Sequence, residues 1–345
     1  MIFFYITLFL LNFFIFLNFN SFKNKLIQDI PDKKRKNHKN NTPLFGGALL
    51  ITNFTIYEIF FIFFFKDTFE NEFFLFYFRE LLIFNIYIFG IFFIGLYDEK
   101  YNLSALTKTI LLVSIITFAT HYSGDFKLDS IDIKSLNINF WLGDFSKIIT
   151  ILCIFFYINA LNLYDGVNMQ IGLYLLIIFI FFVIKSAIIF LSISLIIALI
   201  FFLILNSKSK AFMGDSGVYF VASLIGYEFI KNYNRHLIVS EEIILLTFAP
   251  IIDAIRLFFL RILKRKNPFL GDTNHIHHYL ILSIGKSKTI IATFFLTLVP
   301  ISIYLAGLLS FKIIIILQIF FYFIMISNYT NRLFRTFFFL FYKIK

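Results

Sequence analysis

The sequence has few charged residues and almost no cysteine. Charged side chains make up only 15% of its 345 residues, whereas hydrophobic residues make up 60% and aromatic residues 21%. This composition excludes an ordinary soluble globular domain. The one cysteine, Cys153, lies inside an apolar run, which excludes a disulfide framework and a metal site built from thiolates. The sequence also lacks a phosphate-binding loop of the Walker A type.

Long apolar runs fill most of the chain. They predict an all-α polytopic integral membrane protein, because a helix satisfies its own backbone hydrogen bonds in lipid. The first run has no small-residue cleavage site after it, so we expect a retained span. The run at 217–230 is short, and we expect it to tilt or to lie partly in the membrane interface. We predict about eleven transmembrane helices, at 1–20, 44–65, 73–96, 104–121, 147–163, 169–184, 186–205, 217–230, 241–262, 288–308 and 311–328.

The formal net charge of +11 comes mainly from loops on one predicted face of the membrane. Cations placed between spans orient a membrane protein, so we expect no nucleic-acid partner. The positive-inside rule places this face in the cytoplasm, with the N-terminus outside and the C-terminus inside. The chemically rich loops all emerge on that face. They lie near 31–47, 97–107, 159–169, 206–217 and 261–287.

Carboxylates end two of the predicted spans. Asp98 and Glu99 are adjacent at a helix end, where they could bind a cation or accept a proton, or form an ordinary solvated acidic pair. Asn159, Asn162 and Asp165 recur at three-residue steps, which places them along one helical face. Polar groups at the end of an apolar span are costly without partners, so this stripe also indicates a site.

A third carboxylate, Asp215, lies between Gly214 and Gly217 just before a predicted helix. Backbone N–H groups at a helix start suit a phosphate, and the carboxylate suits Mg²⁺. The alternative is an N-terminal cap in an ordinary turn.

The stretch 264–280 holds three histidines within four positions. The segment from Asp272 to Asn274 can cap a short helix that begins near His275. On such a helix His275 and His278 share a face, and His277 points about 100° away. The spacing does not match a His-Glu-x-x-His zinc motif, so hydrogen-bond donation to phosphate is favoured over zinc.

The segment RKNHKNNTPLFGG at 35–47 places a basic run, a histidine and a proline directly before a Gly-Gly helix start. It could bind a substrate, orient the chain in the membrane or contact anionic lipid.

Together these segments resemble the polyprenyl-phosphate N-acetylhexosamine-1-phosphate transferases. This family includes the enzymes that initiate enterobacterial antigen and teichoic acid, and the peptidoglycan translocase. The resemblance covers residues 29–283 and rests on five motifs in the family's order. They are RKNHKNNTPLFGG, GLYDEKYNLS, NALNLYDG, FMGDSG and PIIDAIRLFFLRILKRKNPFLGDTNHIHHYL.

The resemblance implies a single transmembrane catalytic domain over residues 1–345 that acts at the cytoplasmic face of a bacterial inner membrane. Its expected reaction transfers a UDP-linked N-acetylaminosugar 1-phosphate, GlcNAc-1-phosphate first among them, to polyprenyl (undecaprenyl) phosphate. UMP leaves, and a lipid-linked cell-envelope glycan begins. Mg²⁺ is the expected metal, with Mn²⁺ as an alternative, and a homodimer is one open arrangement.

The resemblance also implies roles for individual residues. Asp215, with Asp165, would hold the metal, and Asp98 would engage or deprotonate the lipid phosphate. The histidines and Arg265 would contact the diphosphate or the sugar. The candidate catalytic residues are Asp98, Glu99, Asp165, Asp215, His275, His277 and His278; the candidate substrate-binding residues are Lys33, Arg35, His38, Asn159, Asn162, Arg265 and Asn274.

This sequence departs from the family pattern at three places. Glu99 replaces the second Asp of the pair, and VNMQIG follows Asp165-Gly166 where a second Asp or Asn is frequent. The histidines read HIHH, which is similar to the aminosugar-transferring branch and unlike the translocase branch. The alternatives are the peptidoglycan-precursor translocase, a membrane transporter and an inactive scaffold. The position of the acids at span ends disfavours a transporter.

Overall fold

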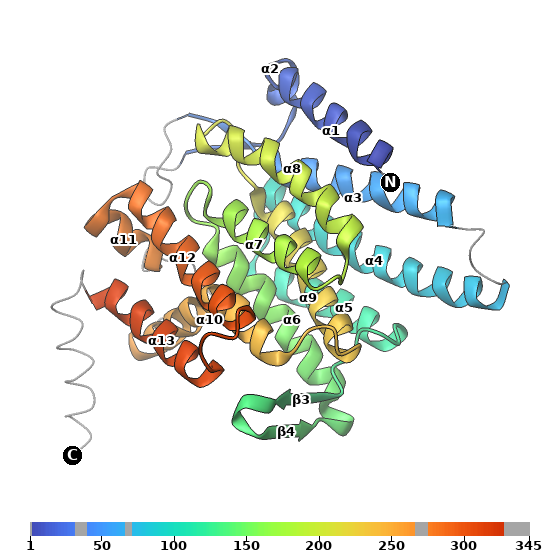
Figure 1. Cartoon of the computed structure of the whole chain (residues 1–345). Coiled ribbons are helices and arrows are strands. Elements are labelled where there is room, and N and C mark those ends of the chain that lie inside the picture. Colours follow the sequence, from blue (N-terminus) through green and yellow to red (C-terminus); the bar gives the residue numbers. More distant parts are fainter. Residues whose placement is uncertain (1, 32–39, 66–70, 266–274, 328–345) are drawn as a thin grey trace.

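A computed structural model describes residues 2–31, 40–65, 71–265 and 275–327, with side chains described except at 65 and 71–77 (Figure 1). Each of the eleven predicted spans corresponds to a helix in these residues. The helices are α1 Ile2–Leu17, α3 Gly46–Phe65, α4 Asn71–Tyr101, α5 Ala105–Tyr122, α6 Ser146–Tyr164, α7 Gln170–Ile184, α8 Ile189–Ser207, α9 Gly214–Asn234, α10 Ser240–Leu263, α12 Lys286–Leu305 and α13 Phe311–Ser327.

The lengths and compositions of the helices identify a multi-pass helical membrane protein. Within the described residues, seven helices are long and apolar enough to cross a membrane. An eighth candidate is α1 together with the following turns, which bend by 60° at a short break. Helices α7 and α13 are apolar but shorter. The count of eleven spans and the orientation of the chain therefore remain predictions.

Helix α9 lies at the centre of the bundle, where it packs against α3, α4 and α6. Its side chains are buried without interruption from Ser216 to Ile230. A helix surrounded by protein does not need an apolar surface for lipid, which explains why α9 is more polar than its neighbours. The expectation that 217–230 tilts or lies partly in the membrane interface stays a prediction.

Glycines let α9 approach its neighbours closely. A Cβ atom on Gly47 of α3 would lie 2.6 Å from the backbone nitrogen of Gly217, and one on Gly95 of α4 would lie 2.5 Å from Cα of Ser216. Such distances exclude any side chain at these positions unless the backbone moves. The first turn of α9 is thus wedged between α3 and α4.

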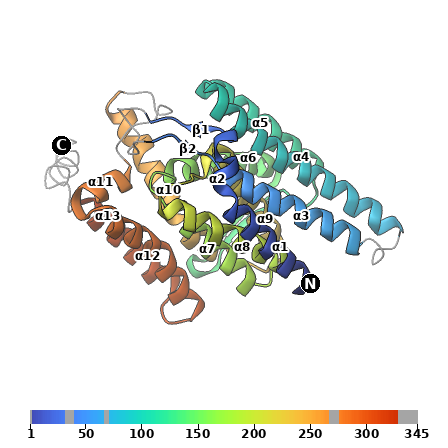
Figure 2. The same ribbon diagram turned by 90° about the horizontal axis from the view of Figure 1, so that it is seen from above.

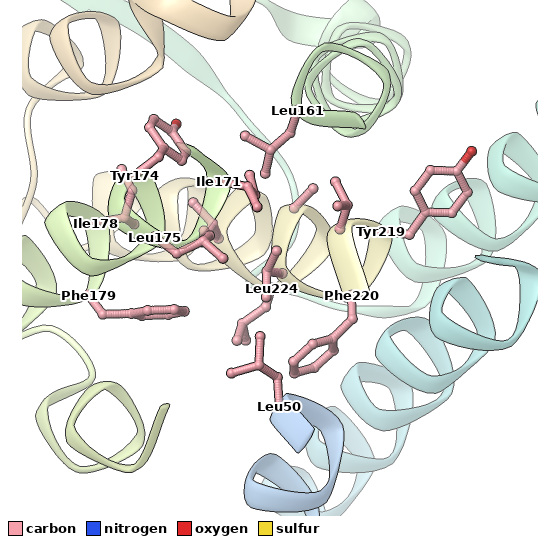
Figure 3. Packing of buried hydrophobic residues seen from close by; sticks show 14 of the residues in the cluster. Leu50, Leu161, Ile171, Tyr174, Leu175, Ile178, Phe179, Tyr219, Phe220 and Leu224 are labelled. Atoms are coloured by element: carbon pink, nitrogen blue, oxygen red, sulfur yellow. The ribbon is translucent and has the colours of Figure 1, made fainter. Parts of the chain in front are cut away.

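Large apolar side chains fill the space around α9. Phe220 and Leu224 of α9 meet Leu50 of α3 on one side and Leu161 of α6 on another (Figure 3). Leu175 of α7 joins the same cluster. Seen from above, α3, α4 and α5 lie on one side of this core, and α11 (Ile276–Ile284), α12 and α13 lie together on the opposite side (Figure 2).

Short strands lie near both ends of the bundle. The pair β1 (Gln28–Asp29) and β2 (Thr42–Pro43) is antiparallel and precedes α3. Leu44, which follows β2, forms a parallel bridge with Phe212 just before α9. The hairpin of β3 (Ser130–Ile133) and β4 (Ile138–Trp141) lies below the start of α6 in Figure 1, far from α2 (Phe19–Phe22) and α11.

Candidate active site

The end of α4 and the start of α9 form one hydrogen-bonded unit. Glu99 Oε1 accepts hydrogen bonds from both the backbone N–H and the hydroxyl of Ser216, each at 2.8 Å. Gly214 begins α9 with φ +79°, and any side chain there would collide with the Glu99 carboxylate. Glu99 therefore serves as an N-terminal cap that comes from a neighbouring helix. This arrangement fixes the position of Asp215, between Gly214 and Ser216.

Asp98 is buried beside the start of α5. Its Oδ1 atom accepts a hydrogen bond from the backbone N–H of Leu103 at 2.9 Å, and its Oδ2 atom forms an ion pair with Lys108. Ser104 caps α5, since its hydroxyl accepts a hydrogen bond from the N–H of Thr107 at 3.1 Å. Lys108 was not among the predicted site residues. Its place in the first turn of the helix that follows the acidic pair was the available signal.

Asp215 lies close to the carboxylates of α4. Burial raises its pKa to about 7, and the negative charge of Asp98 adds to this effect. Lys108 acts in the opposite direction, and Glu99 raises the pKa further. The structure thus brings together three predicted acids and one lysine that the sequence reading did not include.

Asp165 ends α6 at the same end of the bundle. Burial raises its pKa to about 7, and the charge of Asp29 on β1 contributes. Asp29 was also absent from the predicted site. The following loop is held by amides: Asn168 donates to the carbonyl of Asn206 at 3.0 Å, and Asn206 donates to the carbonyl of Ala211 at 2.8 Å. The loop with the sequence VNMQIG, which departs from the family pattern, is therefore hydrogen-bonded to the segment before Asp215.

The two asparagines of the predicted stripe are half-buried on α6. The amide nitrogen of Asn159 donates to the carbonyl of Phe155, 2.7 Å away on the same helix. This bond uses one N–H of the Asn159 amide, and the side-chain oxygen is the group that can accept a hydrogen bond from a substrate. Asn162 lies one turn closer to Asp165. Their proposed contacts with a substrate stay predictions.

The histidine loop reaches the Asp165 turn. A side chain on Gly166 would overlap the imidazole of His277, so the two loops meet at this glycine. The rings of His275 and His277 are stacked, with centroids 5.3 Å apart and planes 6° apart, and His278 lies 4.4 Å from His277. Burial, followed by the charges of His275 and His278, lowers the pKa of His277 to about 3. His277 is therefore a neutral imidazole near pH 7.

The predicted helix start near His275 is confirmed, because α11 begins at Ile276 with His275 as its N-terminal cap residue. The predicted pairing of the histidines differs. His275 has an extended backbone, with φ −67° and ψ 152°. Helical spacing consequently does not apply to it: its ring stacks on that of His277, and its centroid also lies 6.2 Å from that of His278.

An aspartate on α10 anchors this loop. Asp253 is buried, and its Oδ1 atom accepts from Arg256 at 2.6 Å and from the hydroxyl of Tyr322 at 2.9 Å. Its Oδ2 atom lies 3.3 Å from the backbone nitrogen of Ile276 and 3.5 Å from Nδ1 of His275. Asp253 belongs to the predicted Pro-x-x-Asp segment but was not selected as a site residue.

Several predicted residues have no described position at the site. Lys33, Arg35, His38 and Asn274 lie outside the described residues. Arg265 follows α10 with φ +54° and is exposed. Their proposed roles are untested.

The metal assignment depends on few ligands. Within the described residues, no group of three or more His, Cys, Asp or Glu side chains is arranged to hold a metal ion. Mg²⁺ does not require one, because it commonly uses one or two carboxylates together with substrate phosphates and water. The neighbouring carboxylates of Asp98 and Asp215, with one lysine beside them, fit such a cation. For Asp165, the other predicted metal ligand, the charged neighbour is Asp29.

Comparison with known proteins agrees with the motif resemblance. One relative is a probable undecaprenyl-phosphate N-acetylglucosaminyl 1-phosphate transferase of Bacillus subtilis (strain 168), 32% identical over 201 residues, or 54% of each chain. The undecaprenyl-phosphate alpha-N-acetylglucosaminyl 1-phosphate transferase of Salmonella typhi is 25% identical over 277 residues, or 73% of this chain and 68% of that protein. The chain thus spans about half the length of the Bacillus relative.

The matched family region contains four of the predicted catalytic residues. Residues 81–232 match the sequence model of glycosyl transferase family 4, and they include Asp98, Glu99, Asp165 and Asp215. The histidine loop and Asp253 lie beyond this region. The match over residues 81–232 and the two relatives support the family inferred from the motifs.

Proposed function

We propose that the protein transfers GlcNAc-1-phosphate from UDP-GlcNAc to undecaprenyl phosphate and releases UMP. The observation that carries the proposal is the convergence of Asp98, Glu99 and Asp215 around the first turn of α9. The printed names of the relatives supply the donor sugar and the lipid acceptor. Among UDP-aminosugars, the HIHH spacing also favours this branch over the peptidoglycan-precursor translocase.

In the proposed reaction, an oxygen of the lipid phosphate attacks the sugar-linked phosphorus of the UDP-sugar. A new P–O–P bond forms, the bond to UMP breaks, and UMP carries away the electron pair. A phosphate dianion is already a nucleophile, so the protein has to align the two phosphates and reduce their repulsion. Lys108 is placed to attract the anionic acceptor, while Asp98 holds that lysine.

Mg²⁺, when bound, would neutralise charge on the diphosphate; Asp215 would hold it, with Asp165 as the second predicted ligand and Asp98 as the neighbouring carboxylate that the structure adds. Glu99 keeps the first turn of α9 in register through Ser216. The neutral His277, stacked on His275 and in tilted contact with His278, is placed to donate or accept a hydrogen bond near Asp165-Gly166. The direction of that bond depends on its tautomer.

The membrane context supports a lipid substrate. The described residues include seven helices able to span a membrane, and such a bundle can leave the polyprenyl chain in the bilayer while its phosphate reaches the ends of α4 and α9. We propose that this end of the bundle faces the cytoplasm of a bacterial inner membrane, where the UDP-sugar is found. A homodimer is compatible with the proposal and is not required by it.

The direct test is UMP release by membranes that contain the protein, supplied with UDP-GlcNAc, undecaprenyl phosphate and Mg²⁺. We expect release with all three components and little release when any one is omitted. Asp215→Asn should reduce the rate by at least about 100-fold, because an uncompensated phosphate charge remains in the transition state. Equal amounts of the two proteins in the membrane are the control.

Other outcomes separate the alternatives. Release from the peptidoglycan-precursor nucleotide, but not from UDP-GlcNAc, would favour the translocase. No release from any UDP-aminosugar would favour a scaffold or a transporter. Full activity of Asp215→Asn would overturn the metal assignment while leaving the reaction itself in place.

A further inference from the structure

We propose that the β3–β4 hairpin anchors the far end of the bundle in the interfacial region of the bilayer, through Phe140, Trp141 and Phe145. This hairpin lies opposite the candidate site along α6. Asp165 follows the last residue of α6, whereas the hairpin precedes its first residue, and a helix of 19 residues separates them by roughly 28 Å. The proposed reaction does not use this end of the molecule.

One strand of the hairpin is fixed to the protein. The backbone N–H of Asp132 on β3 donates to the hydroxyl of Tyr233 at 2.8 Å, and the carbonyl of Asp132 accepts from Ser240. In the turn that follows, both the N–H and the hydroxyl of Ser135 donate to Glu241 Oε1, at 2.9 and 2.6 Å. These hydrogen bonds fix β3 and the following turn to the helices, and β4 is the outer strand of the hairpin.

The other strand, β4, exposes its aromatic residues. Phe140 is 62% exposed and Trp141 is 77% exposed, and in the next turn Phe145 is 68% exposed. An outer strand with large apolar side chains is a liability in water, because its edge can pair with other chains. Large exposed aromatic side chains therefore call for a covering medium or partner.

The sequence that follows β4 identifies the covering medium as lipid. A candidate membrane span begins at Gly143, two residues after Trp141, and runs to Tyr164. Phe145, Ile148 and Leu152 follow one another at helical spacing, with Ile148 and Leu152 54% and 56% exposed. They continue the exposed aromatic surface of the hairpin directly into the lipid-facing stripe of α6.

The indole ring itself lies at the junction. A Cβ atom on Gly143 would lie 3.7 Å from Nε1 of Trp141, so the ring rests beside the backbone where the span begins. Tryptophan favours this depth in a membrane, because its ring is apolar and its N–H can bond to headgroups or water. The chemistry of the proposed partner is thus that of a phospholipid interface.

The test uses the natural protein, because Trp141 is its one tryptophan. The full chain is placed in phosphatidylcholine vesicles, and its tryptophan emission is recorded, with Trp141→Phe as the blank for tyrosine emission. We expect emission at shorter wavelengths than that of free tryptophan amide. We also expect stronger quenching by lipids brominated near the headgroup than by lipids brominated near the chain end, and weak quenching by iodide.

Two results would overturn the proposal. Long-wavelength emission that iodide quenches, without quenching by brominated lipid, would place the hairpin in water. Short-wavelength emission protected from both quenchers would mean that protein, such as a second copy of the chain, covers the strand. A double variant, Trp141→Phe with Phe140→Trp, moves the probe to the opposite face of β4 and tests whether both faces meet lipid. Neither readout depends on transferase activity.

Discussion

At the scale of single residues, Glu99 is informative because it departs from the pattern of two aspartates. Its carboxylate reaches across from α4 to two donors on one serine of α9. A side chain shorter by one methylene would not reach both donors without movement of a helix. The longer acid is thus a structural adaptation to Ser216 in this chain, and it keeps the turn that carries Asp215 in place.

We expect Glu99→Asp to lower the rate of UMP release by about 10-fold or more, since a shift of the catalytic turn by a fraction of an ångström weakens alignment of the phosphates. Ser216→Ala is the matched variant, because it removes one of the two hydrogen bonds and leaves the carboxylate intact; a smaller loss of activity is expected there. Steady-state rates at saturating UDP-sugar measure both. An unchanged rate in Glu99→Asp would contradict the capping role.

Asp215 should also affect stability in a pH-dependent way. Its pKa is raised from 3.8 to about 7 in the folded protein, so the folded state binds the proton more tightly than the unfolded state does. Its contribution to stability is then fully present below about pH 4 and is lost as the pH rises to about 7. Asp215→Asn has no such titration. Its melting temperature should therefore exceed that of the natural protein by a margin that grows between these pH values.

The measurement is thermal unfolding in detergent without added metal, at about pH 5 and about pH 8. Asp144→Asn, at an exposed position near the hairpin, is the control and should show no growing margin. An Asp215→Asn protein that is less stable than the natural one at the higher pH would contradict the assignment of burial and of Asp98 as the causes.

At the scale of elements, the order of the eleven long helices could be predicted, because apolar runs and the polar residues between them can be identified directly in the sequence. The break at Lys185-Ser186 does separate α7 from α8, with Ser186 at φ +55°. The polarity of α9 was harder to interpret, because only the three-dimensional packing reveals that protein surrounds it. The bend after α1 was likewise not visible as a break in hydrophobicity.

At the candidate site, too, some features could be predicted from the sequence and others could not. Residues in conspicuous polar motifs, such as Asp98, Asp215 and His277, were predicted correctly to lie at one end of the bundle. Residues whose importance depends on contacts in the folded chain were missed. Lys108 pairs with Asp98 across the turn between α4 and α5, and Asp253 accepts a hydrogen bond from Tyr322, which is 69 positions away in sequence.

Two glycines of α4 allow a test of whether close packing between helices positions the site. A methyl group on Gly95 would lie 2.5 Å from Cα of Ser216, whereas one on Gly90 would meet only the end of the Ile115 side chain, at 2.7 Å. The backbone at Ser216 cannot move aside as easily as the flexible end of the Ile115 side chain. Gly95→Ala should therefore displace the start of α9 and abolish most UMP release.

Gly90→Ala is the matched control on the same helix, and we expect it to retain most of the activity. Size-exclusion chromatography of both variants in detergent separates loss of fold from loss of geometry. Comparable activity in the two variants would mean that the close approach of α4 and α9 does not position the site.

At the scale of the whole molecule, the main question is which way the bundle lies in the membrane. The candidate site and the β3–β4 hairpin occupy opposite ends of α6, and the sequence predicts that basic residues concentrate in the loops at the site end. The positive-inside rule therefore predicts that the site lies in the cytoplasm and the hairpin outside. This orientation is also the one in which a UDP-sugar can reach Asp215.

Single cysteines can test this orientation in whole cells. Cys153 is first replaced by serine, which removes the one natural thiol. A cysteine at Ser130, on β3, should then react with a membrane-impermeant maleimide added outside. A cysteine at Lys208, after α8, should react only once the cells are opened, because we place that loop on the cytoplasmic side. Both variants should retain UMP release, which shows that the labelled proteins are folded.

If both positions were labelled from outside, or if only Lys208 were, the placement of the site in the cytoplasm would be wrong. The family assignment rests on other observations and would stand.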